Sequence, residues 1–459
     1  MKEAHPSIQT AYGIFMNKTL FCAAIIFMLC AAVNNSVYGN GINRNGISAE
    51  SMAMGGADVG WAQSPLDAMG DNPAGLGFLD GNEFDLGGVL ASANGKFNKP
   101  TADSSGDLSS QIQGLPEGAF DMKLDKLPVP VSVAVSCIPE STLSAEWNYL
   151  DPPSSSSITY GYQEDKSEIL VLRTALGVGV QILPQLSLGA SLGADYNQNE
   201  LVTPYVFQNL EPAGDAPYDG AKTLLHLTTS GWGWNAQLGA MYRPITNLQF
   251  GFSWQSKFKV DTTGGASGNA GAQFGAPGNS AYSFDYNAEV DNTFPQEFDL
   301  GGSWKFLPKW RAEAEVDWID WSGSFHTLPV KLSNGTGAVG ATLGNFQDNI
   351  PLNWKSEFVF RAGLEYSVLD NLSLRLGYSH GNNPVPDSTL NPMTAAIMED
   401  TITAGIGYHW RRCQFDLAYQ CDLPDRQHVS TSDLLAGEYS NSNTKVYINW
   451  FAVTMRVNF

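Results

Sequence analysis

Residues 310–318 read WRAEAEVDW, and this stretch decides the fold. Apolar side chains occupy every second position, from Trp310 to Trp318, and a charged side chain stands at each position between them. Because successive side chains of a strand point to opposite faces, the pattern predicts a β-strand with one apolar and one charged face. Residues 357–366, EFVFRAGLEY, show a similar alternation. The alternation recurs from about residue 83 onward, so the chain is predicted to be all-β.

The composition narrows the class of protein. The 459 residues include 47 Gly and 11% aromatic residues, but only 15% are charged, against about 25% in soluble globular proteins. The net charge of −21 argues against a nucleic-acid partner, because such binding needs clustered Lys and Arg. No zinc-like Cys or His spacing occurs, so neither a metal nor a cofactor is expected. The cysteines beyond the N-terminal segment are Cys137, Cys413 and Cys421.

The N-terminal segment predicts export. Lys2 and Lys18 precede an apolar run at 20–33, LFCAAIIFMLCAAV, and small residues follow near Gly39. A positive start, a short apolar core and small residues are typical of a secretory signal peptide, which we assign to residues 1–39.

Alternation alone fits either a soluble sandwich or a barrel in a membrane. The lengths of the connections favour the membrane barrel, because short turns alternate with long loops, as in bacterial outer-membrane barrels. Six turns and seven loops require fourteen strands. The predicted turns are Lys126 to Pro128, Leu183 to Gln185, Arg243 to Asn247, Leu307 to Lys309, Val368 to Asn371 and Arg411-Arg412, and the predicted loops are 93–117, 139–167, 204–223, 261–294, 321–354, 381–399 and 422–443.

Two further features support a barrel. Aromatic residues cluster beside both kinds of connection, where they suit the two membrane interfaces. The chain also ends at Phe459 after alternating apolar residues, which resembles the signal of the barrel-assembly machinery. Unpaired backbone groups in hydrocarbon cost several kcal/mol each, so the sheet must close. We therefore expect residues 83–459 to form a monomeric fourteen-stranded antiparallel transmembrane β-barrel in the bacterial outer membrane.

Residues 40–82 lack the alternation and are rich in small residues, so they form either a periplasmic tail or a plug. The stretch at 53–76, AMGGADVGWAQSPLDAMGDNPAGL, resembles the N-terminal hatch of the FadL family of outer-membrane transporters for long-chain fatty acids and aromatic hydrocarbons. The resemblance implies a fourteen-stranded barrel plugged by its N-terminal hatch. Further similar stretches are GWGWNAQLGAMYRP (231–244), FPQEFDLGGSWKF (294–306), DWIDWS (317–322), NWKSEFVFRAGLEY (353–366) and LGYSHGNNPVP (376–386).

The predicted inner face carries charges of both signs, which are expected to pair with each other and with the plug. A charged, plugged lumen is a poor path for an apolar compound, because its polar groups would lose their hydration. The compound is therefore expected to leave sideways through the wall. The inner-face charges are Lys305, Arg311, Glu313, Glu315, Asp317, Arg361, Glu365, Arg375, Asp416 and Arg456.

The resemblance places that exit at a kink in the third strand. A proline cannot donate to the ladder, and Pro139 follows Cys137 and Ile138 near this point. We expect a lateral opening at Cys137, Ile138 and Pro139. The hatch motif at Asn72, Pro73 and Ala74 is expected to gate it. The alternative is that Pro139 only ends the strand.

The long loops are expected to contact the ligand and the membrane surface. An apolar cluster at Tyr205, Val206, Phe207 and Leu210 is expected to capture the ligand, or alternatively to pack the loops together. Acidic loop residues are expected to form a solvated face that divalent cations bridge to lipopolysaccharide. They include Asp151, Glu164, Asp165, Asp215, Asp219, Asp422, Asp425 and Asp433.

The expected function is passive uptake of hydrophobic compounds, foremost long-chain fatty acids, with no catalysis. The alternatives are uptake of aromatic hydrocarbons by the same fold and a general diffusion porin with an open lumen. A lipolytic enzyme using Ser379 and His380 is a third alternative. It is weakened because its G-x-S-x-G match lies inside a predicted strand rather than at a strand-to-helix turn.

Overall fold

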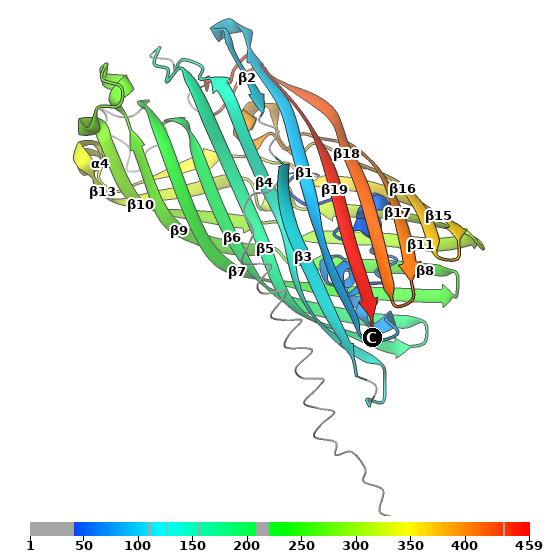
Figure 1. Cartoon of the computed structure of the whole chain (residues 1–459). Helices are drawn as coiled ribbons and strands as arrows, with labels where there is room; N and C mark the ends of the chain where they lie inside the picture. The colour runs from blue at the N-terminus through cyan, green and yellow to red at the C-terminus, as the bar shows by residue number, and fades with distance from the viewer. Residues whose placement is uncertain (1–40, 109–111, 125, 155–156, 208–219, 435–436) are drawn as a thin grey trace, which may run out of the picture.

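The computed structural model describes residues 41–459 except 109–111, 125, 155–156, 208–219 and 435–436, so the predicted signal peptide lies outside the described residues. The wall is a closed antiparallel β-barrel (Figure 1). Fourteen strands pair in order around it, and the last pairs with the first from Glu83↔Asn458 to Asn98↔Asn443. The wall strands are β1 Glu83–Lys99, β3 Ile112–Lys123, β4 Val131–Leu150, β5 Tyr162–Leu183, β6 Leu186–Val206, β7 Lys222–Ile245, β8 Leu248–Gln255, β11 Glu297–Leu307, β12 Trp310–Ile319, β15 Glu357–Leu369, β16 Leu372–Gly381, β17 Asp400–Trp410, β18 Cys413–Val429 and β19 Ser442–Asn458.

All six predicted turns join neighbouring wall strands, so the predicted strand count is confirmed. These turns lie at one end of the barrel, which we call the turn end. The C-terminus also lies there (Figure 1), where the Phe459 amide donates to the carbonyl of Asn82. The seven long connections lie at the opposite end, which we call the loop end.

Three of the predicted loops, 93–117, 261–294 and 321–354, prove to contain additional strands. There β9 pairs with β10, and β10 pairs with β13. Strands β9 and β13 are rich in Gly, Ser and Thr and alternate poorly. Strand β10 does alternate, but its apolar side chains, such as Phe284 and Val290, are buried rather than exposed as in a membrane strand. The elements in the long connections are β2 Ser104–Leu108, β9 Phe258–Asn269, β10 Ser283–Phe294, β13 Thr327–Thr336, β14 Phe346–Pro351, α4 Gly337–Leu343 and the short 3₁₀ helices η2 Pro100–Ala102, η3 Gly271–Phe274, η4 Ser280–Tyr282, η5 Trp321–Gly323, η6 Asp387–Thr389 and η7 Pro392–Thr394.

The two faces of the wall divide as predicted. Phe358 and Phe360 of β15 expose 52% and 55% of their surface, whereas Arg311 and Asp317 of β12 expose 2% and 1%. The apolar side chains therefore face outward and the charged ones face the lumen, as in membrane barrels. Among the described residues, no helix is both long and apolar enough to cross a membrane.

Residues 41–82 lie inside the barrel and are almost entirely buried (Figure 1). We call them the hatch. Its helices, α2 Ala49–Ala53, α3 Pro65–Gly70 and η1 Pro73–Phe78, begin at Ser48, Ser64 and Asn72, whose side chains each accept a hydrogen bond from a backbone N–H of the first turn. Wall glycines make room for the hatch. A Cβ atom at Gly251 of β8 would lie 1.9 Å from the carbonyl oxygen of Val59.

Candidate functional site

An apolar cavity lies at the loop end of the barrel. Strands β6, β7, β10, β13 and β14 contribute most of its lining. The lining is largely aliphatic and aromatic, as is usual for sites that bind hydrophobic ligands. It includes Leu201, Leu227, Val330, Phe346, Leu352 and Met393.

The predicted capture cluster lies at this cavity only in part. Tyr205 and Phe207 line the cavity. Val206 is buried but is not part of the lining, and Leu210 lies outside the described residues. The ring of Phe207 also packs against Phe346, with centroids 5.5 Å apart. These aromatic residues therefore both line the cavity and hold the loops together, and the two expectations are compatible.

The polar groups of the lining are acidic or neutral. Glu168, Glu200 and Asp348 lie at the cavity, and none of its lining residues is Lys or Arg. Lys166 lies nearby, but its Nζ atom pairs with Glu200 at 2.6 Å and with Glu168 at 3.2 Å. Burial raises the pKa of Asp348 to about 6, although a hydrogen bond from the Tyr205 hydroxyl opposes the rise. As far as the described residues line it, the cavity therefore offers apolar contacts and no free cation.

The β3–β4 ladder is interrupted toward the loop end. Its pairing runs from Lys123↔Ser132 to Gly118↔Cys137 and stops there. Among the described residues, 112–117 of β3 pair only with β1, and 138–146 of β4 make no ladder bonds to β3. The predicted opening at Cys137, Ile138 and Pro139 thus falls where the ladder ends.

Pro139 does not end β4. The strand continues to Leu150, with a bulge at Glu140 that shifts the register against β5 between Pro139 and Ser141. The alternative that Pro139 terminates the strand is therefore wrong. A bulge bends a strand locally, and here the bend occurs beside the interrupted ladder.

The first described hatch residues occupy this interruption. The Thr142 amide of β4 donates to the carbonyl of Ile42 at 2.9 Å, and the Ser141 hydroxyl donates to Asn43 Oδ1 at 2.9 Å. The buried guanidinium of Arg44 contacts both strands: its Nη1 atom lies 2.5 Å from Glu117 of β3 and 3.2 Å from the Pro139 carbonyl of β4. Residues 42–44 therefore bridge the two strands where the ladder does not. Their role is not visible in the sequence, because they carry no motif.

The predicted gate lies elsewhere in the lumen. The Asn72 side chain donates to the carbonyls of Val59 at 2.8 Å and of Ala240 in β7 at 3.4 Å. The Ser187 hydroxyl of β6 donates to the Ala74 carbonyl at 2.6 Å, and Pro73 lies against Gly189 of β6. The hydrogen bonds of Asn72 and Ala74 thus connect them to β6 and β7 rather than to the interrupted edge of β4.

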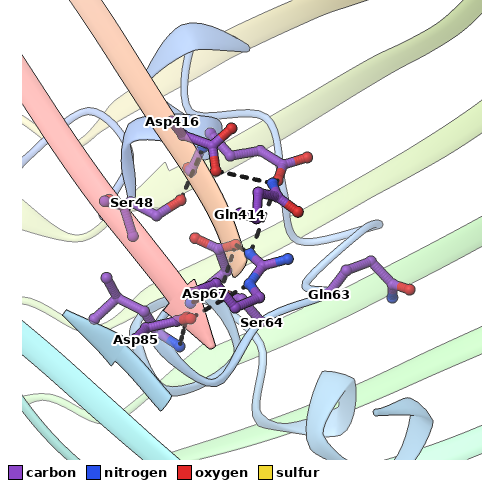
Figure 2. A network of polar contacts seen from close by, with 12 residues as sticks. Ser48, Gln63, Ser64, Asp67, Asp85, Gln414 and Asp416 are labelled. Atoms are coloured by element: carbon purple, nitrogen blue, oxygen red, sulfur yellow. Dashed lines mark hydrogen bonds and ion pairs between the residues drawn. The ribbon is translucent and has the colours of Figure 1, made fainter. Parts of the chain in front are cut away.

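The lumen charges pair with one another and with the hatch, as predicted. Glu50 of α2 lies 2.9 Å from Arg311, 3.3 Å from Arg375 and 3.8 Å from Arg456. Figure 2 shows the neighbouring contacts, where Asp67 of α3 and Ser64, which caps that helix, lie beside Asp85 of β1, with Gln414 and Asp416 of β18 close by. The Ser64 hydroxyl donates to Asp67 at 2.8 Å. Ion pairs therefore fill the lumen around the hatch.

Among the described residues, a cluster of three carboxylates in the lumen offers the ligand atoms of a cation site. Carboxylate oxygens of Glu297, Asp299 and Asp317 lie within 4.8 Å of one another, and such oxygens are ligands for hard cations. The guanidinium of Arg361 already contacts Asp317 at 2.5 Å. Arg361 thus supplies a positive charge to this group.

The proposed serine hydrolase pair is not assembled. Ser379 and His380 are consecutive residues of β16, so their side chains point to opposite faces. The Ser379 side chain is buried, whereas His380 is partly exposed and its Nδ1 atom lies 2.9 Å from Asp400. A nucleophile and a base need to be within hydrogen-bond reach of each other, and these two are separated by the strand.

The expectation of a solvated acidic loop face is wrong for three of its residues. Asp151, Asp165 and Asp422 are buried. Asp151 lies 2.7 Å from the Lys222 ammonium. Asp165 accepts a hydrogen bond from Thr203, and Asp422 accepts hydrogen bonds from Thr401 and Trp450. Residues Asp215 and Asp219 lie outside the described residues.

Comparisons with known proteins agree with this architecture. The long-chain fatty acid transport protein of Escherichia coli O6:H1 (strain CFT073) is 20% identical over 394 residues, covering 80% of this chain and 83% of that protein. The crystal structure of the Pseudomonas putida toluene transporter TodX superposes with a TM-score of 0.74 at 22% identity, covering 92% of this chain and 100% of that one. A Pseudomonas aeruginosa FadL homologue gives a TM-score of 0.73 at 16% identity, with the same coverage.

A family model matches nearly the whole chain. The model described as outer membrane protein transport protein (OMPP1/FadL/TodX) matches residues 28–459. This chain therefore belongs to the OMPP1/FadL/TodX family of outer-membrane transport proteins for hydrophobic compounds.

Proposed function

We propose that the protein takes up hydrophobic compounds passively, by capture in the loop-end cavity and lateral release through the wall at the β3–β4 interruption. The observation that carries this proposal is the combination of an apolar cavity at the loop end with an interrupted ladder beside the hatch. The first supplies a site for the ligand and the second a place where the wall is held by few backbone bonds.

A route along the lumen axis is less favourable. An apolar compound moving past the hatch would separate Glu50 from Arg311 and Arg375, or would desolvate them without replacing their partners. Breaking a buried ion pair costs about 3–5 kcal/mol. Lateral release avoids that cost and transfers the compound into lipid, where burial stabilises each CH₂ group by about 0.8 kcal/mol.

Two hatch segments are candidates for the gate. Residues 42–44 cover the interrupted edge of β4 and must withdraw before a ligand can pass there. The motif at Asn72, Pro73 and Ala74 anchors the hatch to β6 and β7, so its movement would loosen the hatch as a whole. We propose that the motif controls the position of the hatch and that residues 42–44 cover the exit itself.

Long-chain fatty acids are the first candidate substrate, since the E. coli relative bears that function in its name. A specific observation favours the second candidate, aromatic hydrocarbons. A fatty acid carries a carboxylate, and the cavity offers it the acidic residues Glu168, Glu200 and Asp348 without a free Lys or Arg. The undescribed loop residues 208–219 and 435–436 contain no Lys or Arg either. An uncharged hydrocarbon meets no such repulsion.

A bulky side chain placed in the β3–β4 interruption tests whether the ligand leaves there. The Gln113 side chain of β3 donates to the Ser144 hydroxyl of β4 at 2.9 Å, so Ser144 faces β3 across the unpaired stretch. Ser144→Trp should reduce uptake of both radiolabelled oleate and toluene into outer-membrane vesicles at least tenfold. Ala404→Trp is the matched control, because it adds the same side chain to the outer face of β17, where the ladder is continuous.

Heat-modifiable migration on gels should show that both variants fold. Unchanged uptake by the folded Ser144→Trp variant would exclude lateral release at this place. The ratio of oleate to toluene uptake by the unsubstituted protein separates the two substrate classes. Free passage of small sugars in a liposome-swelling assay would instead support the general porin.

A further inference from the structure

Three cations stand side by side on the outer wall near the loop end. Lys96 of β1 is the direct cross-strand partner of Lys445 of β19, and Lys445 is in turn the partner of Arg426 of β18. Directly opposite residues share a face, and their Cβ atoms lie about 4.5–5.5 Å apart. Arg426, Lys445 and Lys96 therefore form one row across three neighbouring strands, which we call the basic row.

The row faces outward, away from the lumen. Phe451 of β19, six residues beyond Lys445 toward the turn end and on the same face, exposes 55% of its surface to the lipid side. Val446, the neighbour of Lys445, is buried, as the opposite face requires. Lys96 and Arg426 are exposed.

In the described part of the chain, a single carboxylate faces this row, that of Asp107, the cross-strand partner of Lys96. Asp107 of β2 lies 3.7 Å from Lys96, but both side chains are more than 70% exposed and such pairs contribute little. Among the described residues, neither Arg426 nor Lys445 forms an ion pair. Like charges directly opposite each other destabilise a sheet, so three in a row on an otherwise acidic chain indicate an anionic ligand.

The surroundings provide hydrogen-bonding groups. One step further toward the loop end, Asn98 of β1 pairs with Asn443 of β19, and Asn443 pairs with His428 of β18. Asn98, Asn443 and, from β2, Ser105 and Asp107 border a shallow hollow that the basic row lines. Three cations beside one carboxylate and several neutral hydrogen-bonding groups suit a phosphate group, which accepts several bonds at once.

The height of the row points to the membrane surface. Phe451 and Tyr419 form an outward aromatic pair with centroids 5.0 Å apart, as expected near an interface. Lys445 lies six residues beyond Phe451, which is roughly 20 Å along a strand and less along the membrane normal because the strands tilt. The row is thus held above the apolar band, at the level of lipid headgroups on the outer side.

We propose that the basic row is a binding site for the phosphate groups of lipopolysaccharide, the phosphorylated glycolipid of the outer leaflet. This site is separate from the ligand cavity and does not depend on the transport function. In this site, protein cations contact the phosphates directly. The sequence-based expectation differed, because there divalent cations bridge acidic loop residues to lipopolysaccharide.

The test uses the detergent-solubilised full-length protein, stripped of bound lipid, and three probes: lipopolysaccharide, enzymatically dephosphorylated lipopolysaccharide and inorganic phosphate. The triple variant Lys96→Gln, Arg426→Gln, Lys445→Gln should bind lipopolysaccharide roughly 100-fold more weakly than the unsubstituted protein. The matched control, Lys257→Gln, Lys259→Gln, Lys331→Gln, removes three cations from the β8–β9 connection, β9 and β13, and should change binding less than twofold.

Dephosphorylation of the lipopolysaccharide should weaken binding to the unsubstituted protein by a similar factor, and inorganic phosphate should compete only weakly. Heat-modifiable migration checks that every variant has folded. The proposal is overturned if the folded triple variant retains its affinity, if the control loses as much, or if the dephosphorylated lipid binds equally well. Competition by phosphate at low millimolar concentration would assign the row to a soluble anion instead.

Discussion

Replacement of Arg44 by Met should loosen the hatch at the β3–β4 interruption. The Arg44 and Glu117 side chains expose only 2% and 0% of their surface, and the guanidinium also donates to the carbonyls of Pro139 and Ile47. The substitution removes the only cation that lies against the buried Glu117 carboxylate in the described residues. Removal of one partner of a buried ion pair costs about 3–5 kcal/mol. This corresponds to at least a 100-fold increase in local opening, since about 1.4 kcal/mol is a factor of ten.

Hydrogen exchange measured by mass spectrometry reports this opening directly. Amides of the hatch from residue 42 and of β4 at 141–142 should exchange at least 100-fold faster in Arg44→Met, and amides of β12 should be unchanged. Arg412→Met, in an exposed turn, is the control. The double variant Arg44→Met, Glu117→Gln should recover much of the protection, because it no longer buries an unpaired charge. Exchange within twofold of the unsubstituted protein in the single variant would refute the reasoning.

Three further outcomes follow from the geometry. Gly239→Val should displace the hatch motif, because a Cβ atom there would lie 2.1 Å from Asn72 Oδ1, and overpacking costs about 1–3 kcal/mol; faster proteolysis of the hatch in the folded barrel checks it. The pKa of Asp348, raised by burial from 3.8 to about 6, means that the native state holds this proton more tightly than the unfolded chain. The resulting stabilisation is complete below pH 3.8 and is lost as the pH rises through 6. Hydrogen exchange of the backbone amides of 346–351, corrected for the intrinsic pH dependence of exchange, should therefore become faster over that pH range in the unsubstituted protein but not in Asp348→Asn. Phe207→Ala should weaken binding of an apolar ligand to the loop-end cavity at least tenfold in a fluorescence titration, whereas equal affinity would remove Phe207 from the site.

The wall could be predicted from the sequence because lipid imposes a strict rule on it. Each strand crossing the membrane must alternate between two faces, as Trp310 to Trp318 do, and each turn must be short. The extensions β9, β10, β13 and β14 escape that rule: β9 and β13 alternate poorly, and β10 alternates but buries its apolar face. Their positions depend on pairing between segments far apart in the chain.

The candidate site was only partly predictable, for a related reason. Pro139 marks a disturbed strand because a missing N–H is visible in the sequence. The role of Arg44 is not visible, because it depends on the simultaneous approach of Glu117 and the Pro139 carbonyl from two strands. The basic row was missed similarly, since Lys96, Arg426 and Lys445 become neighbours only when β1, β18 and β19 pair.

The most direct measurement of the proposed route traps the ligand during transport. A diazirine-bearing apolar probe is added to outer-membrane vesicles, irradiated during uptake, and its attachment sites are mapped by mass spectrometry. Lateral release predicts labelling of the loop-end cavity and of 112–117 and 138–146 beside the interruption. Labelling that passes instead along the lumen, at Arg311 and Arg375 and on toward the turn end, would contradict it.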